Sequence, residues 1–237
     1  MWVVQPRQLR LQVGDGPKVL PEDAVAADRL FESAKQENPR IFDGPVVLVT
    51  ASSQDGLADP LMLSWSAGSY RSLALRRLGH RISTLFVTAL ITTKDGGVLV
   101  GRAAPHTAKA GLWQLPGGSV TPPPPGRALD LSYLAAEASR ELLEETGIEL
   151  KPQTLSLWAV SQGDHQNIGV CFRAAETDWV DVSVVELFIR LQIDAEFSEV
   201  ASVRTAAGAA ELGHGVDYLP QYLNLRRPGR PGHPPQR

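Results

Sequence analysis

The stretch Glu137-Ala-Ser-Arg-Glu-Leu-Leu-Glu-Glu-Thr-Gly-Ile148 decides the fold. At about 100° per residue of an α-helix, its glutamates share an arc of about 100°. An apolar stripe runs beside that arc, so the acidic face is expected at the edge of a core rather than opposite it. A helix over residues 130–146 is predicted, with Asp130 as its N-cap and Gly147 just past its end. The acidic residues are Glu137, Glu141, Glu144 and Glu145, and the apolar ones are Leu131, Ala135, Ala138 and Leu142.

The acidic face has two interpretations. A solvated surface would interleave lysines or arginines, because like charges four residues apart destabilise a helix. Only Arg140 stands beside this cluster. Clustered carboxylates with one basic partner are better explained by a hard divalent cation, because Mg²⁺ and Mn²⁺ prefer oxygen ligands.

The residues around this stretch extend the motif. Arg140-Glu-Leu-Leu-Glu-Glu-Thr-Gly-Ile148 matches the second half of the Nudix box, REUXEEXGU, at every fixed position, and Leu115-Pro-Gly-Gly118 matches the loop that opens it. Val98-Leu-Val-Gly-Arg102 and Gly111-Leu-Trp113 are similar to the strand and loop that precede the box. From residue 83 to 227 the chain resembles the Nudix hydrolase family.

The resemblance implies a fold and an activity. The fold is α/β (α+β), a Nudix αβα sandwich with a mixed sheet. The activity is Mg²⁺- or Mn²⁺-dependent hydrolysis of a nucleoside diphosphate linked to another moiety. By resemblance, Glu141, Glu144 and Glu145 hold the metal together with a main-chain carbonyl near Gly118, and Arg140 orients the glutamates.

The sequence departs from the family's pattern at one place. The position of the first box glutamate is Ser132, and about eight extra residues, including Pro122 to Pro125, separate Gly118 from the helix. In the family that glutamate mostly braces the loop, so its loss leaves metal binding in place. The insertion puts the geometry between loop and helix, and hence the rate, in question.

Other roles in the site are less sharply indicated. The candidates for a general base are Glu141 within the box, Glu196 or Glu199 near a predicted strand, and Asp164 or His165 in a loop. Arg102 and Lys109 are the nearest positive residues flanking the loop, and of the two Arg102 is preferred as a phosphate contact.

The first 82 residues are interpreted as a small N-terminal α+β extension. Asn38-Pro-Arg-Ile-Phe-Asp-Gly-Pro45 and Gly68-Ser-Tyr-Arg71 resemble the leader of a Nudix branch that cleaves UDP-sugars. This resemblance places Tyr70 and Arg71 at the border of the nucleotide. The expected substrate is therefore an NDP-sugar such as a UDP-sugar, which gives a nucleoside monophosphate and a sugar phosphate. The alternatives are ADP-ribose, a dinucleoside polyphosphate, or a non-catalytic module that binds a nucleotide.

Composition excludes several other classes. The 237 residues are 43% hydrophobic with a net charge of −3, which argues against a disordered chain and against a nucleic-acid binder. No apolar run reaches the ~18 residues of a membrane span, and the N-terminus lacks the pattern of a signal peptide, so a cytoplasmic protein is expected. The single Cys171 excludes an internal disulfide framework. Residues 228–237, rich in proline and arginine, are expected to be a disordered tail.

The remaining pattern predicts the other elements. The apolar run at residues 182–191 is left open between strand and buried helix, and between core and the surface of a homodimer. Lys94-Asp-Gly-Gly97 predicts a hairpin turn between its flanking strands. Strands are expected at residues 2–4, 9–13, 46–50, 61–65, 84–92, 98–101, 155–161, 168–174 and 199–203, and further helices at residues 21–38, 70–78 and 218–225.

Overall fold

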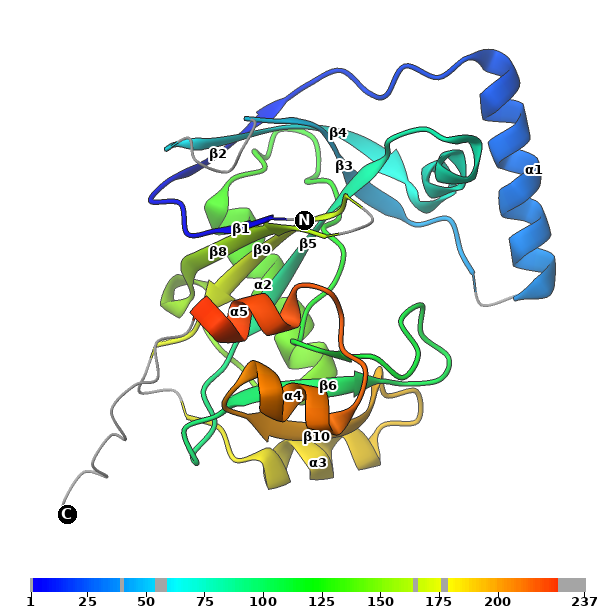
Figure 1. The fold of residues 1–237 in the computed structure, drawn as a ribbon. Helices are drawn as coiled ribbons and strands as arrows, with labels where there is room; N and C mark the ends of the chain where they lie inside the picture. Colours follow the sequence, from blue (N-terminus) through cyan, green and yellow to red (C-terminus); the bar gives the residue numbers. More distant parts are fainter. Residues whose placement is uncertain (1, 39–40, 54–58, 164–165, 176–178, 226–237) are drawn as a thin grey trace. The chain divides into compact units, whose positions relative to one another are not determined.

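The computed structural model describes residues 2–38, 41–53, 59–163, 166–175 and 179–225. Asp164, His165 and the predicted tail at residues 228–237 lie outside these ranges. The chain forms two compact units (Figure 1), each built from several segments. Unit 1 contains Met1–Phe86, Ser119–Leu134 and Val160–Val170, and unit 2 contains Val87–Gly118, Ala135–Ala159 and Cys171–Arg237.

A mixed seven-stranded sheet organises unit 1, and three of its strands continue along the chain into unit 2. Its order is β1-β8-β9-β5-β3-β4-β2. Strands β2 and β4 pair in parallel, whereas β3 pairs antiparallel with both β4 and β5. The strands are β1 (Trp2–Val4), β2 (Leu9–Val13), β3 (Pro45–Ser52), β4 (Leu61–Ser69), β5 (Ser83–Leu90), β8 (Ser156–Gln162) and β9 (Ile168–Arg173).

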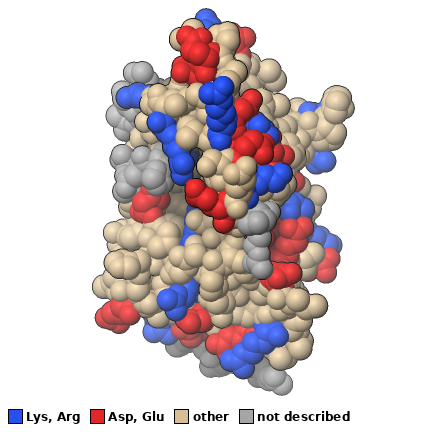
Figure 2. All heavy atoms as spheres, turned by 90° about the vertical axis from the view of Figure 1, so that its right-hand side faces the viewer, with Lys and Arg blue, Asp and Glu red and all other residues tan. Residues whose placement is uncertain are grey.

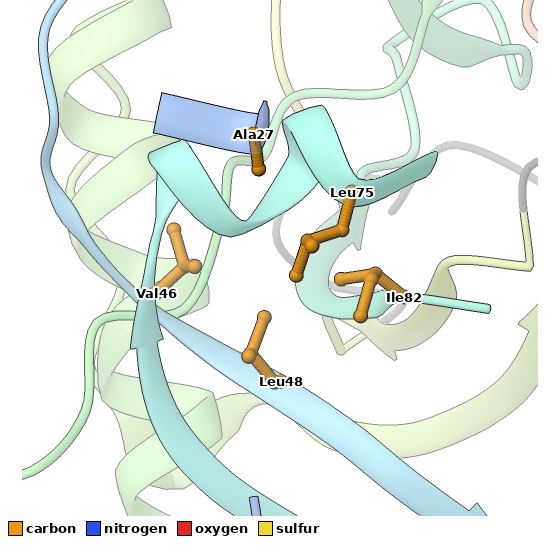
Figure 3. Close-up of a cluster of buried hydrophobic side chains, with 5 residues drawn as sticks. All are labelled: Ala27, Val46, Leu48, Leu75 and Ile82. Carbon is orange, nitrogen blue, oxygen red and sulfur yellow. The ribbon is translucent and has the colours of Figure 1, made fainter. Parts of the chain in front are cut away.

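Two helical elements cover part of this sheet in unit 1. Helix α1 (Pro21–Glu37) begins with a proline at its first position and ends at Asn38, before Pro39, as the sequence predicts. The predicted helix at residues 70–78 is the 3₁₀ helix η1 (Tyr70–Leu78). Their apolar faces meet strand β3 in a buried cluster (Figure 3) of Ala27, Val46, Leu48, Leu75 and Ile82.

Unit 2 contains a second, antiparallel sheet in the order β10-β6-β7. Its strands are β6 (Val98–Ala103), β7 (Trp113–Gln114) and β10 (Phe197–Val203). The predicted hairpin is wrong in its extent, because after the Thr92–Val98 bridge strand β6 joins β10 and β7 instead of β5. One edge of β5 has β9 as its neighbour, and on the other edge the N–H groups of Val87 and Ala89 bond to the loop at residues 116–118, so neither edge is free for β6.

Helix α2 (Leu131–Thr146) has the ends that its sequence predicts. The Asp130 carboxylate accepts a hydrogen bond from the backbone N–H of Tyr133 at 2.8 Å, as an N-cap does. Gly147 has φ 72°, which is the left-handed conformation that ends many helices. Ala138 and Leu142 are fully buried, so the apolar stripe packs into the core and the acidic arc lies at its edge.

The structure resolves the ambiguous run as helix α3 (Val182–Leu191), capped by the Asp181 side chain. Val185 and Ile189 are buried, whereas Val184, Leu187 and Leu191 are exposed. Helix α4 (Ala206–Leu212) was missed by the sequence pattern, because its alanines carry little periodic contrast, although Thr205 caps it. Helix α5 (Leu219–Leu225) and the short 3₁₀ helix η2 (Pro152–Thr154) complete the described elements.

These elements confirm the expected α/β class with a mixed sheet. Among the described residues, no helix is both long enough and apolar enough to cross a membrane.

Candidate active site

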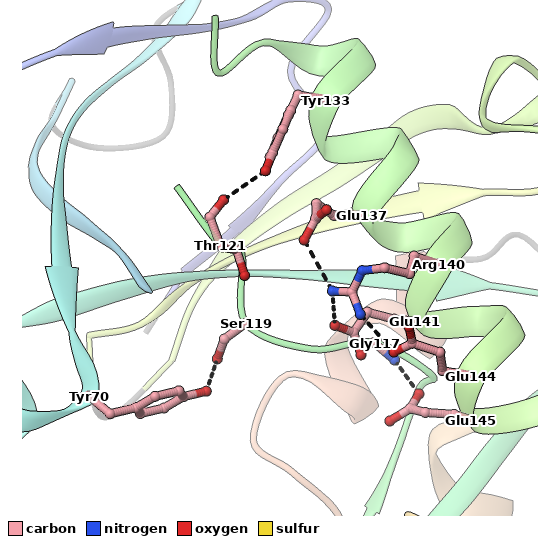
Figure 4. Close-up of polar contacts among 10 residues, drawn as sticks. All are labelled: Tyr70, Gly117, Ser119, Thr121, Tyr133, Glu137, Arg140, Glu141, Glu144 and Glu145. Atoms are coloured by element: carbon pink, nitrogen blue, oxygen red, sulfur yellow. Dashed lines mark hydrogen bonds and ion pairs between the residues drawn. The ribbon is translucent and has the colours of Figure 1, made fainter. Parts of the chain in front are cut away.

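The acidic face of helix α2 is organised around Arg140 (Figure 4). Its guanidinium contacts the carboxylates of Glu141 and Glu144 at 2.6 Å each, and that of Glu137 at 3.1 Å. These positions are three or four residues apart, or adjacent, on one helix, so a single long side chain reaches all of them. Arg140 therefore holds three of the four predicted glutamates in one geometry.

Glu145 is the fourth glutamate, and it is only 2% exposed. Its carboxylate accepts a hydrogen bond of 2.7 Å from the backbone N–H of Gly117. Gly117 has φ 149°, and a Cβ there would overlap the backbone oxygen of Val87, so only glycine fits. Hydrogen bonds of 2.9 Å from Ala89 N–H to the Pro116 carbonyl and from Val87 N–H to the Gly118 carbonyl fasten this loop to β5.

The second loop glycine lies against Glu141. A Cβ on Gly118 would stand 2.5 Å from the Glu141 carboxyl carbon, so the absence of a side chain lets the carboxylate lie against the loop backbone. The Gly118 carbonyl accepts one hydrogen bond, from Val87 N–H, and its second lone pair remains available to another ligand. The loop and helix α2 thus form a cradle lined by oxygen atoms.

In the absence of a cation, the surroundings of this cradle disfavour the ionised form of its buried carboxyl groups. Burial raises the pKa of Glu141, and the charges of Glu144 and Glu196 raise it further, whereas Arg140 lowers it. Burial also raises the pKa of Glu145 well above its usual range, and Glu196 and Glu141 add to this, against the Gly117 N–H. Burial first, and the charges of neighbouring glutamates second, therefore favour the protonated form of Glu141 and Glu145 or a cation bound beside them.

Glu196 comes to this site from a distant part of the sequence. It lies in the turn just before strand β10, where its carbonyl accepts a hydrogen bond from Ala104 N–H at 2.8 Å. Its side chain is exposed, and its charge acts on both Glu141 and Glu145. The structure therefore brings Glu196 to the box glutamates, whereas Glu199 pairs with Arg102 at 3.2 Å.

These residues fit a hard divalent cation. Carboxylate and carbonyl oxygens are the ligands that Mg²⁺ and Mn²⁺ prefer, and the mutual repulsion of buried Glu141 and Glu145 is relieved by positive charge. Within the described part of the chain, no three acidic, histidine or cysteine side chains already surround one point as a ligand set. Arg140 is the cation that Glu141 and Glu144 contact instead.

Lys109 is a cation beside Glu145 that the sequence pattern ranked below Arg102. Its ammonium group lies 5.9 Å from the ring centroid of Tyr218, which is buried. Lys109 as a whole is exposed, but the surroundings of its ammonium group desolvate it and lower its pKa, and the charges of Glu145 and Asp217 oppose this. No motif marks Tyr218 or Asp217, because they reach the site only through the fold of the C-terminal segment.

Arg102 is exposed and already has partners in unit 2. Its guanidinium forms the ion pair with Glu199 and a hydrogen bond of 3.4 Å to the Gly111 carbonyl. Trp113 is 4% exposed and donates a hydrogen bond from Nε1 to the Leu212 carbonyl at 3.0 Å. A phosphate role for Arg102 stays a prediction and would require this ion pair to open.

Tyr70 and Arg71 belong to unit 1, and each is tied to a different partner. The Tyr70 hydroxyl donates a hydrogen bond of 2.7 Å to the Ser119 hydroxyl, one residue after Gly118 (Figure 4). Arg71 lies over the Phe31 ring at 4.7 Å. Its guanidinium contacts three carboxylates at 2.9–3.1 Å, those of Asp28, Glu32 and Asp43.

The Arg71 cluster is electrostatically self-contained. Burial by itself would raise the pKa of Asp43. The hydrogen bonds from the backbone N–H and the guanidinium of Arg71 outweigh this effect and lower that pKa. Figure 2 shows acidic and basic side chains mixed on the face that carries α1. The nucleotide role predicted for Tyr70 and Arg71 stays a prediction.

In this α/β fold, the glutamates of one helix lie against a glycine loop. The model of the NUDIX domain matches residues 84–213, more than half of the chain, so this chain belongs to the NUDIX family. Nudix hydrolases generally use divalent metals. No curated protein matches the chain.

Several solved structures are similar at low sequence identity. The MutT protein from Methanosarcina mazei Go1 has 21% identity and a TM-score of 0.41, over 60% of this chain and 90% of that one. The NUDIX domain of Shewanella oneidensis NrtR, solved with ADP ribose, has 19% identity and a TM-score of 0.41, over 62% of this chain and 88% of that one. A bifunctional NMN adenylyltransferase/ADP ribose pyrophosphatase from Francisella tularensis, complexed with AMP and a Mn ion, has 16% identity and a TM-score of 0.43, over 63% and 44%.

Proposed function

We propose that the protein is a divalent-metal-dependent pyrophosphohydrolase that cleaves a nucleoside diphosphate linked to another moiety. The observation that supports this best is the position of Glu141 and Glu145 against the Gly117–Gly118 loop, where the charge of Glu196 acts on both. Buried carboxylates that raise one another's pKa are costly in a structural role. They are suited to a site that works with cations bound.

Different residues are proposed to bind the metal, orient the glutamates and fix Glu145. Glu141, Glu144, Glu145 and the Gly118 carbonyl are proposed to hold Mg²⁺ or Mn²⁺, which neutralises the anionic substrate and lowers the pKa of the attacking water. Arg140 is proposed to orient the glutamates, since it already contacts Glu141 and Glu144 at 2.6 Å. The Gly117 N–H fixes the Glu145 carboxylate at 2.7 Å. Positioning and charge stabilisation then dominate the chemistry.

Glu196 is proposed as the general base, with Glu141 as the alternative within the box. Its carboxylate is exposed yet close enough to influence the charges of Glu141 and Glu145, so it can receive a proton from water at the edge of the site. A Glu196→Gln variant should lose kcat with little change in metal affinity. Loss of metal affinity in step with kcat would instead make Glu196 a ligand.

Lys109 is proposed as a phosphate contact alongside the predicted Arg102. The Lys109 ammonium acts on Glu145 through its charge, whereas Arg102 is held by Glu199. A Lys109→Ala variant should raise KM more than Arg102→Ala does. The reverse order would return the assignment to Arg102.

The best-supported substrate class is an NDP-sugar such as a UDP-sugar, on the resemblance of residues 38–45 and 68–71 to the UDP-sugar-cleaving branch. Tyr70 and Arg71 are then proposed to border the nucleotide. ADP-ribose is an alternative substrate that the same glutamates fit equally well. The NrtR domain was solved with ADP ribose, and the Francisella enzyme is named as an ADP ribose pyrophosphatase. Dinucleoside polyphosphates and a non-catalytic nucleotide-binding module are the remaining alternatives. Residues 83–227 are proposed as the catalytic domain and residues 1–82 as its N-terminal extension.

A substrate panel tests these proposals. Wild type and Glu145→Gln are incubated with UDP-sugars, ADP-ribose and dinucleoside polyphosphates, with Mg²⁺, with Mn²⁺ or with a chelator. We expect metal-dependent release of a nucleoside monophosphate, reduced by more than about 100-fold in the variant. Binding without hydrolysis of any compound would favour the non-catalytic module. Preference for adenine over uracil compounds would reject the UDP-sugar assignment.

A further inference from the structure

Unit 1 contains a cavity of about 530 Å³ that none of the box glutamates lines. This volume lies within the range of small-molecule sites in proteins. Four parts of the chain contribute to its wall: residues 14–18, strand β3 at residues 48–51, Ser64 of β4, and residues 80–83.

Part of the cavity wall is apolar. Leu48 and Ile82 belong to the buried cluster of unit 1 shown in Figure 3, and at 3% and 4% exposed they support the wall from behind without presenting surface to a ligand. Their neighbours Val49 and Ala51 on β3 also line the cavity, and they are half-buried and exposed respectively. A ligand can therefore rest a neutral part on Val49 and Ala51, which form the apolar floor of the cavity.

One wall is a glycine-containing segment that leaves the sheet beside the cavity. Gly14 N–H donates a hydrogen bond of 2.7 Å to the Trp65 carbonyl, which prolongs the pairing of β2 with β4. A Cβ on Gly14 would stand 3.0 Å from the Thr50 hydroxyl, so this close approach favours glycine. Beyond it, the backbone N–H groups of Gly16 and Lys18 have no acceptor among the residues that the structure describes.

The rim of the cavity carries two cations without carboxylate partners. Lys18 and Arg81 are exposed, and neither forms an ion pair within the described ranges of the chain. This contrasts with Arg71 of the same unit, which contacts three carboxylates. His80 is bound to Asp23 at 2.8 Å. The carboxylate in the lining is Asp15, and hydroxyls of Thr50, Ser64 and Ser83 also line the cavity.

We propose that this cavity binds a small phosphomonoester at a site separate from the catalytic glutamates. Its phosphate would lie between Lys18 and Arg81, because a dianion satisfies two cations, the free N–H groups and the hydroxyls together. Its neutral part would rest on Val49 and Ala51. Such compounds have the same chemistry as the products of the proposed reaction, so the site is placed to sense or retain one.

Calorimetric titration of the full chain with a chelator present tests the proposal. Without metal, the acidic catalytic site repels phosphates, so binding there does not mask the cavity. The probes are glucose 1-phosphate, inorganic phosphate and neutral glucose. We expect saturable binding of glucose 1-phosphate, weaker binding of inorganic phosphate, and no heat from glucose.

Three variants locate that binding. Lys18→Ala/Arg81→Ala should weaken glucose 1-phosphate binding by about tenfold or more, because two charge-assisted contacts are lost. Gly16→Leu should also weaken it by filling the cavity without a change of charge. The control Arg29→Ala/Lys35→Ala, which removes two exposed cations from α1, should leave it within about twofold.

The outcomes are decisive in both directions. No saturable binding by wild type, or equal losses in the rim and control variants, would overturn the site. Equal affinity for inorganic phosphate and glucose 1-phosphate would overturn the role of the apolar floor. This experiment measures binding and not hydrolysis. The proposed catalytic function can therefore be refuted while this binding site is confirmed, and the binding site can be refuted while the catalytic function is confirmed.

Discussion

Replacing Glu145 by glutamine should stabilise the metal-free protein while it abolishes most of its activity. The Glu145 carboxylate is 2% exposed and lies near the negative charges of Glu141 and Glu196. Glutamine keeps the shape of the side chain, and its oxygen can still accept the 2.7 Å hydrogen bond from Gly117 N–H. The substitution therefore removes mainly the cost of a buried charge.

The size and pH dependence of the effect follow from proton linkage. The pKa of Glu145 is raised in the folded chain, so the folded state binds more protons than the unfolded state above the ordinary glutamate value of about 4.3. The free energy of unfolding of wild type therefore falls as pH rises through this window. A net gain of about 1–2 kcal/mol is expected for the variant at neutral pH, or about 2–4 °C in Tm for each kcal/mol.

Thermal unfolding with a chelator present, from pH 4 to pH 8, measures this effect. The advantage of Glu145→Gln over wild type should be small at pH 4 and grow toward pH 8. Glu144→Gln is the matched control, because the Glu144 side chain is 55% exposed and its removal should shift Tm little. Mg²⁺ should then raise the Tm of wild type and reverse the order. A variant that melts below wild type at pH 8 without metal would refute the reasoning.

Three further substitutions test the loop and the N-terminal unit. Gly117→Ala should lower the free energy of unfolding in urea by about 3 kcal/mol or more, because φ is 149° and the added methyl group overlaps a β5 carbonyl. The control Gly96→Ala, at φ 82° with open space around it, should lower it by about 1 kcal/mol. Equal losses in the two variants would contradict the loop geometry. Tyr70→Phe removes one hydroxyl hydrogen bond of 2.7 Å and should lower the free energy of unfolding by about 1 kcal/mol, and an unchanged value would show that the bond contributes nothing. Arg71→Met removes the cation that lowers the pKa of Asp43, so its loss of stability should be clear at pH 7 and shrink only as pH falls below the ordinary aspartate value of about 3.9. A loss independent of pH would mean that packing on Phe31 dominates.

Local pattern was sufficient for the elements whose signal repeats along one segment. The 3.6-residue period, Asp130 and Gly147 predicted helix α2 almost to the residue, and the same period placed the glutamates at the edge of the core. Residues 182–191 gave no period, because α3 carries apolar side chains on its exposed face as well as on its buried one. The hairpin turn after β5 forms, but the sequence overstated the pairing that follows it, because a turn signal cannot show that both edges of a strand are already occupied.

The sequence by itself determined the family, the acidic helix and the glycine loop, because each is encoded within a short ordered motif. Only the tertiary structure decided which distant groups meet that motif. Glu196 joins the box glutamates because β10 pairs with β6, whereas Arg102 is held by Glu199 through that same pairing. Contacts between residues far apart in the chain depend on strand order and packing, which no local spacing records.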